Sequence, residues 1–138
     1  MKAKQIFLFL TITTGFLMMS FVFPQDQKKP GSWEIPAEYK AKENPYKDDA
    51  SLDRLGKALY SKHCRACHGN EGAGYGPKSK NLETWPGDFS VDAVQSHTDG
   101  ELYYMTFIGR DEMPSFEDKI TDDEGRWAII NYIRSLKK

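Results

Sequence analysis

The residues best suited to chemistry in this 138-residue chain stand together in the short stretch KHCRACHGN, residues 62–70. It contains both cysteines, Cys64 and Cys67, and His68 follows the second cysteine directly. Two thiols at this spacing lie on neighbouring faces of one helical turn, where they can add to the two vinyl groups along one edge of a porphyrin. The next imidazole then reaches the iron as proximal ligand. The C-x-x-C-H pattern therefore predicts one covalently attached c-type haem, with His68 bound to iron.

Three other interpretations of this motif are a zinc site, a redox-active cysteine pair and a structural disulfide. A zinc site needs four ligands, and the remaining histidines, His63 and His97, stand in no zinc-finger spacing. A thioredoxin-like redox pair needs a strand–helix–strand context, which the sequence lacks. A structural disulfide suits an exported chain but gives no reason for His68. Because random placement of the cysteines and histidines produces this motif in roughly 3 of 10,000 shuffles, haem attachment is favoured.

A second axial ligand is needed, and Met113 is the preferred candidate. It stands in the loop GRDEMPSF, where Pro114 restricts the backbone and prevents a helix. Met105 falls within a predicted helix, where core packing is its expected role. His97 is the alternative ligand because haems with two histidine ligands exist. His63 precedes the attachment turn and is expected to be a bystander.

Two helices are predicted to frame the motif and the Met113 loop. The first covers ASLDRLGKALYSKHC, residues 50–64, where leucines follow helical spacing. Asp49 or Ser51 can cap its start. The second runs from about residue 99 to 108, with Gly109 as its C-terminal stop.

A third helix is predicted in TDDEGRWAIINYIRSLKK at the C-terminus. Thr121 and Glu124 have the spacing of a capping box. Its broad apolar face consists of Trp127, Ile129, Ile130, Ile133 and Leu136. The stretch between the first two helices is rich in glycine and loop residues and has no strand pattern. The pattern indicates an all-α domain with long loops, whose core something else must help to fill.

The N-terminus has the pattern of an export signal. Lys2 and Lys4 precede an uncharged apolar run at residues 6–23, which would span roughly 27 Å as a helix. Residues 1–24 are therefore a signal peptide or an uncleaved membrane anchor. The length of the run, and the lack of a small-residue cleavage site, favour the anchor, with the rest of the chain exported to the periplasmic side of a bacterial inner membrane.

Residues 25–49 are polar and proline-rich and are predicted to form an extended tether rather than a packed element. Trp33 and Ile35 could dock on the domain or on a partner. The compact domain is predicted at residues 50–138. A net charge of −1, without a basic stripe, gives no sign of nucleic-acid binding.

Residues 50–138 resemble a class I cytochrome c. The resemblance rests on the first helix with Gly56 and Tyr60, the Cys64-Cys67-His68 turn, Gly76-Pro77, Met113-Pro114, and a last helix with Trp127 and Tyr132. It implies the cytochrome c fold, with three main helices and long loops around one covalently bound haem.

The resemblance also implies roles for individual residues. Gly56 would allow the first helix to pack closely on the last, against Tyr132. Pro77 would offer its carbonyl to His68, orienting the imidazole. The family surrounds its haem propionates with aromatic or basic donors, for which the candidates are Trp85, Tyr75, Tyr103 and Arg110.

The expected function is one-electron transfer rather than catalysis, because His68 and Met113 would fill both axial positions of the iron. The resemblance to small bacterial monohaem cytochromes implies redox partners in a membrane respiratory chain, such as a quinol-oxidising complex or a terminal oxidase. The alternative is a haem-based ligand-binding, sensor or peroxidase-type protein with a labile sixth ligand.

Overall fold

A computed structural model describes residues 27–138. In chain order its elements are α1 (Ala37–Lys40), the 3₁₀ turn η1 (Ala50–Leu52), α2 (Asp53–His63), α3 (Arg65–His68), the 3₁₀ turn η2 (Ser79–Asn81), α4 (Asp92–Gln95), α5 (Asp99–Phe107) and α6 (Asp123–Ser135). Within that range the chain forms no strand, only isolated bridges. The predicted all-α fold with three main helices, α2, α5 and α6, is confirmed. The predicted signal or anchor at residues 1–24 lies outside the described residues.

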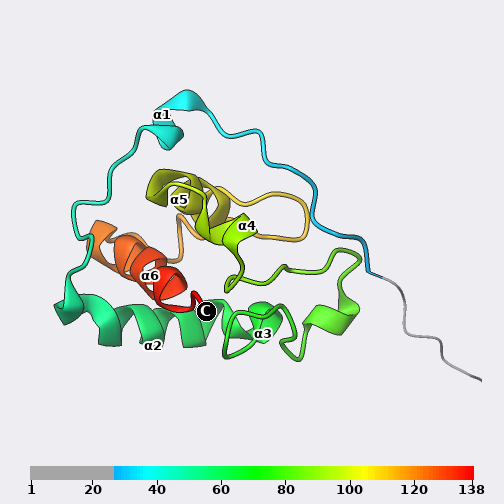
Figure 1. Cartoon of the computed structure of the whole chain (residues 1–138). Coiled ribbons are helices and arrows are strands. Elements are labelled where there is room, and N and C mark those ends of the chain that lie inside the picture. The colour runs from blue at the N-terminus through cyan, green and yellow to red at the C-terminus, as the bar shows by residue number, and fades with distance from the viewer. Residues whose placement is uncertain (1–26) are drawn as a thin grey trace, which may run out of the picture.

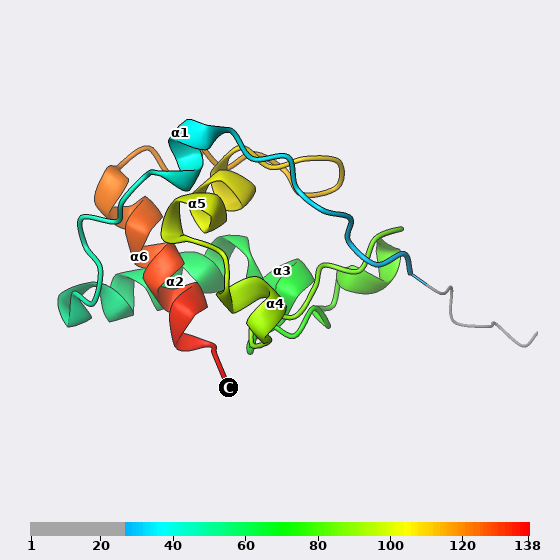
Figure 2. The same cartoon turned by 45° about the horizontal axis from the view of Figure 1, so that its top comes forward.

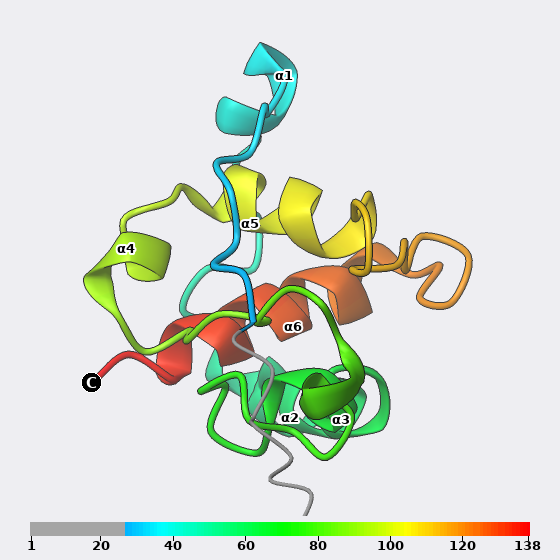
Figure 3. The same cartoon turned by 90° about the vertical axis from the view of Figure 1, so that its right-hand side faces the viewer.

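The three long helices are stacked, with α6 between α2 below and α5 above (Figures 1 and 3). The crossing of α2 and α6 depends on Gly56. A Cβ placed there would overlap the carbonyl oxygen of Ala128 and lie 3.2 Å from the Cβ of Tyr132. The close approach implied for Gly56 is therefore present, although its nearest neighbour is the backbone of α6 rather than the Tyr132 ring.

The core lies between α5, α6 and the loop that joins them. Its buried apolar cluster consists of Leu102, Tyr103, Phe107, Phe116, Ile120, Trp127, Ile129, Ile130 and Ile133. The apolar face predicted for the last helix is thus buried, except that Leu136 is only half-buried. This cluster shows that the helices bury an apolar core of their own beside any contribution from a prosthetic group.

The helix starts differ in part from the expected ones. Asp49 accepts a hydrogen bond from the Ser51 N–H at 2.9 Å and caps η1, as expected. The capping box predicted at the last helix is wrong, because Asp122 is the cap and accepts from the Gly125 N–H at 2.6 Å. The carboxylate of Asp122 reaches the third N–H of the helix directly, so Thr121 is not needed.

A capping box is present instead at α5. Thr98 Oγ1 accepts from the Glu101 N–H at 3.1 Å, and the Glu101 carboxylate accepts from the Thr98 N–H at 2.8 Å. The His97 ring and the Lys40 ammonium group also lie near this carboxylate. The hydrogen bond from the Thr98 N–H, followed by the interactions with His97 and Lys40, holds the pKa of Glu101 below its usual value despite partial burial.

Replacing Glu101 with glutamine should lower stability at neutral pH but not at low pH. Since the folded-state pKa is depressed, ionised Glu101 stabilises the fold above its unfolded-state pKa, and this contribution is lost as pH falls through the folded value. Glutamine keeps the box but has no charge. We expect a deficit of up to about 1 kcal/mol at pH 7 that shrinks as the pH falls through the folded-state pKa of Glu101, measured by denaturant unfolding of both proteins over a series of pH values. A deficit independent of pH would contradict the assignment.

Residues 27–49 are extended for most of their length, but they pack on the domain, which corrects the expectation of an unpacked tether. The segment arches over α5 and descends to the start of α2 (Figures 1 and 2). Ile35 is buried, and the Tyr39 ring lies 4.8 Å from that of Tyr104. The Asn44 side-chain amide donates to Asn131 at 2.8 Å. Among residues 27–138, none of the helices has both the length and the hydropathy of a membrane span.

Candidate haem-binding site

The C-x-x-C-H motif lies where α2 passes into α3. Cys64 is the residue between the two helices, and its N–H donates to the Tyr60 carbonyl at 2.8 Å. The His68 N–H donates to the Cys64 carbonyl at 3.0 Å, which closes one helical turn around the motif. Cys64 is buried, Cys67 is half-buried, and both are free thiols. The motif thus forms the single helical turn that haem attachment requires.

The loop after the motif is tied back to it by backbone hydrogen bonds. The Gly74 N–H donates to the His68 carbonyl at 2.9 Å, and the Gly76 N–H donates to the Cys67 carbonyl at 3.0 Å. These bonds fix the C-terminal end of α3 and hold the turn in one conformation.

The His68 side chain is buried and stacks on Phe89, with ring centroids 4.4 Å apart and planes inclined by 22°. Burial lowers the pKa of His68 to about 4, so the imidazole is neutral near pH 7, the form that binds a metal. Its Nδ1 is buried and has no hydrogen-bond partner. The hydrogen bond expected from His68 to the carbonyl of Pro77 is therefore not formed in this structure, and the role of Pro77 stays a prediction.

The surroundings of the Cys64 thiol are unlike those of a redox-active cysteine. Burial, followed by the neighbouring Cys67, raises the pKa of the Cys64 thiol to about 12. Reactive dithiols need a depressed thiol pKa, because the thiolate is the nucleophile. The surroundings of Cys64 therefore disfavour the thioredoxin-like alternative.

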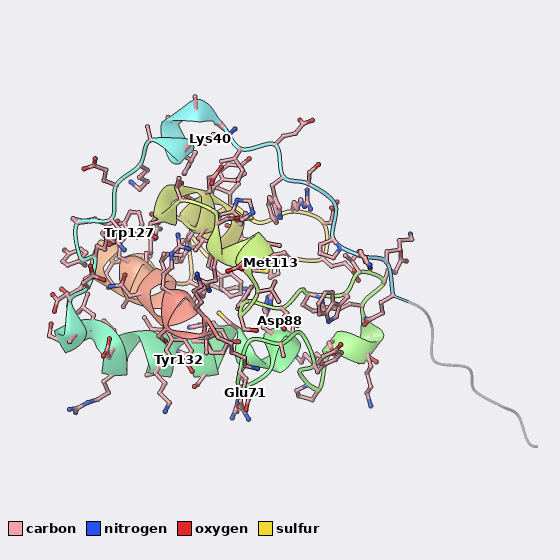
Figure 4. All side chains as sticks on the ribbon, viewed as in Figure 1. Lys40, Glu71, Asp88, Met113, Trp127 and Tyr132 are labelled. Atoms are coloured by element: carbon pink, nitrogen blue, oxygen red, sulfur yellow. The ribbon has the colours of Figure 1, made fainter. Side chains whose placement is uncertain are left out.

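Met113 lies in a short hairpin after α5. The Arg110 N–H donates to the Met113 carbonyl and the Met113 N–H donates to the Arg110 carbonyl, both at 2.8 Å. Gly109 begins the hairpin with a φ of +72°, which favours glycine. In Figure 4, Met113 lies between α5 above and α3 below. Its half-buried side chain packs against the core cluster, and its ligand role stays a prediction.

The competing side chains are engaged elsewhere. His97 Nδ1 lies 3.3 Å from a Glu101 oxygen. The His63 ring packs edge-on against Phe116 at 5.9 Å, and burial, followed by nearby lysines, lowers the pKa of His63. Met105 packs against the core cluster from α5, as its position in a helix predicted.

Among the four aromatic or basic candidates for the propionates, Trp85 is the one with a spare buried donor. Its Nε1 is buried without a hydrogen-bond partner. The Tyr103 hydroxyl accepts from Arg126 at 2.9 Å, and Arg110 donates to two backbone carbonyls of the N-terminal segment. Tyr75 is 77% exposed.

The residues of this region fit a covalently attached haem. Two free thiols share one turn with a neutral buried imidazole. The Nδ1 atom of His68 and the Nε1 atom of Trp85 are both buried without hydrogen-bond partners, and these two residues stand at the two ends of the loop region between them. A buried polar atom without a partner costs about 1–3 kcal/mol, so a group that supplies partners is expected there. Phe89, which covers His68, was not foreseen, because a single aromatic residue in a loop has no periodic signal.

Comparison with known families decides what this arrangement is. The family described as cytochrome c oxidase, cbb3-type, subunit III matches residues 51–133. The chain belongs to this family. It is a class I c-type cytochrome with the cytochrome c fold and covalently bound haem c, and it takes part in haem-based electron transfer.

Solved structures give the same fold. The KustC0563 c-type cytochrome is 28% identical, with a TM-score of 0.52, over 60% of this chain and 98% of that one. A chain of the Kuenenia stuttgartiensis reducing HAO-like protein complex Kustc0457/Kustc0458 is 26% identical, with a TM-score of 0.56, over 64% of this chain. The match spans 45% of that chain, less than half its length.

A third structure supports the fold alone. Cytochrome CL from the marine methylotrophic bacterium Methylophaga aminisulfidivorans MPT is 20% identical, with a TM-score of 0.55, over 78% of this chain and 69% of that one. No curated protein matches the chain.

Proposed function

We propose that this cytochrome is an exported one-electron carrier whose iron is held by His68 and Met113. The observation that carries the proposal is the buried, neutral His68 on the closed C-x-x-C-H turn. Met113 lies in a hairpin closed by two backbone hydrogen bonds, which suits a side chain that must keep one position. When bound, the haem supplies a one-electron Fe(II)/Fe(III) couple.

Each residue of the site has a defined task in this proposal. The thioether of Met113 is a soft ligand that favours Fe(II) and so raises the reduction potential relative to a second histidine. In the haem-bound protein the carbonyl of Pro77 would accept from His68 and fix the orientation of its ring, a bond that this structure does not contain. The spare Nε1–H of Trp85 would donate to a propionate of the haem, which would relieve the cost of burying this donor. Because His68 and Met113 would both hold the iron, no position on it would be left open for a substrate.

We place the protein in or beside a membrane respiratory chain, on the periplasmic side of the inner membrane and anchored by residues 1–24. The family description, which names a cbb3-type oxidase, supports a terminal oxidase as electron acceptor. A quinol-oxidising complex is the corresponding donor. Without Lys2 and Lys4 the chain has 17 basic and 20 acidic residues, a charge of −3, so it should be attracted to a basic or neutral partner, with association rates that fall as salt rises.

The absorption spectrum of the purified oxidised protein tests the proposal. We expect a low-spin haem with the weak red-end band of methionine–iron bonding, and colour that stays with the chain after denaturation. A high-spin spectrum that shifts at low concentrations of cyanide or carbon monoxide would support the alternative, a ligand-binding, sensor or peroxidase-type protein. Loss of all colour on denaturation would exclude covalent attachment.

A further inference from the structure

We propose that Arg110 and Glu112 are positioning residues that hold the Met113 hairpin by tying it to two other segments. The first segment is the strap, residues 27–33, which precedes the part of the chain that the family matches. The second is the segment of residues 83–85. The strap thereby sets how readily Met113 leaves the iron, and this inference rests on the proposed His68–Met113 ligation.

Arg110 connects the hairpin to the strap. Its two terminal nitrogens donate to the backbone carbonyls of Gly31 and Ser32, each at 2.5 Å. Its guanidinium also lies over the Trp33 ring, 4.0 Å from the ring centroid. A planar guanidinium can form two parallel hydrogen bonds and an aromatic stack at once, and neither lysine nor a neutral side chain reproduces this geometry.

Glu112 connects the same hairpin to the second segment. Its two carboxylate oxygens accept from the backbone N–H groups of Glu83 and Thr84, at 3.0 and 2.9 Å. Hydrogen bonds to an ionised carboxylate are stronger than bonds between neutral groups. The chain directly before Met113 is therefore held on two sides.

The strap and the second segment are in turn joined to each other. The Lys28 N–H donates to the Glu83 carbonyl at 3.0 Å, and the Trp85 N–H donates to the Lys28 carbonyl at 2.9 Å. The side-chain amide nitrogen of Gln27 donates to the backbone carbonyls of Ser79 and Leu82 at 2.6 and 2.8 Å. Strap, second segment and hairpin thus form a closed ring of contacts, which also positions Trp85, the residue with the spare buried donor.

The ring matters because the other contacts of the hairpin hold its C-terminal side. Ser115 Oγ and the Phe116 N–H donate to the Phe107 carbonyl at 2.8 and 3.1 Å, and Met113 packs against the core cluster. The two backbone bonds between Arg110 and Met113 close the turn, and the side chains of Arg110 and Glu112 tie its N-terminal side to the neighbouring segments. When either side chain is removed, the Met113 thioether should dissociate more often, and an external ligand should enter more quickly.

The test uses oxidised holoprotein and the rate at which imidazole displaces the methionine–iron band. Arg110→Gln and Glu112→Gln should each raise this rate by about tenfold, which corresponds to the loss of one strong contact. Trp33→Ala should raise it as well. In the double variant Trp33→Ala/Arg110→Gln the displacement rate should exceed that of Arg110→Gln by less than the increase that Trp33→Ala causes by itself. The two effects should not add, because both changes break the same contact.

Two matched controls separate positioning from general destabilisation. Glu117→Gln removes the same charge just beyond the hairpin, where no hydrogen bond to the side-chain carboxylate is present among the described residues. Asn44→Ala removes the bond to Asn131 and lowers stability farther along the N-terminal segment. Both controls should leave the imidazole rate within about twofold of the parent.

The outcomes are distinct. If the parent protein has the methionine–iron band and the hairpin variants exchange imidazole at the parent rate, the positioning inference is wrong and the proposed ligation stands. If the parent lacks the band, the proposed ligation fails and the inference fails with it. Should Arg110→Gln not fold, Arg110→Lys keeps the charge but loses the two-point bond and the stack, and it should still raise the rate.

Discussion

Replacing Met113 with alanine is expected to lower the reduction potential by on the order of 0.2 V, part of the roughly 0.8 V range that axial ligands cover. The red-end band should disappear, and the oxidised protein should bind cyanide or imidazole directly. The physical reason is that the soft thioether stabilises Fe(II), and its loss leaves one axial position to water or an added ligand. Redox titration and ligand titration of the purified holoprotein measure both effects.

Met105→Ala is the matched control for that experiment. Met105 is half-buried on α5 and packs against the same core cluster as Met113. Its truncation should cost about 1–3 kcal/mol of stability and leave potential and spectrum close to those of the parent. An unchanged potential and band in Met113→Ala would show that Met113 is not the ligand, and His97→Ala would then be the next variant to examine.

Replacing Gly56 with alanine is expected to destabilise the folded protein by about 3 kcal/mol or more. The added methyl group would overlap the Ala128 carbonyl of α6, which is backbone and cannot turn aside as a side chain can. Helices α2 and α6 would have to separate, and the cluster around Trp127 and Ile130 would lose packing. Denaturant unfolding of the holoprotein, followed by far-ultraviolet circular dichroism, measures the change.

Gly31→Ala provides the control for a glycine-to-alanine change of the same size. No atom lies within 4 Å of a Cβ placed at Gly31, and its φ is not positive. Its carbonyl, which accepts from Arg110, is kept. This variant should stay within about 0.5 kcal/mol of the parent. Similar stabilities for both variants would mean that the helix crossing does not require glycine.

The local part of the structure was predictable because it depends on residues close together in the chain. The attachment turn follows from the spacing of Cys64, Cys67 and His68, which one helical turn converts into a shared site. The three main helices follow from apolar periodicity, and the ends of α5 agree with the predicted range to within one residue. The cap of α6 was misplaced because Thr121 and Asp122 are both good caps and their order of preference depends on tertiary packing.

The sequence by itself determined the haem attachment, the all-α class and the family, since each rests on short-range spacing or on periodicity. Only the tertiary structure decided that residues 27–49 lie on the domain, because proline-rich, polar composition is the same in a free tether and in a packed one. The same holds for the hydrogen bonds of Arg110 and Glu112. Each joins a side chain to a backbone group more than 25 residues away in the chain, and no local pattern records which distant carbonyl or N–H a side chain will reach. The buried, unpartnered Nε1 of Trp85 likewise results from packing and has no local signal.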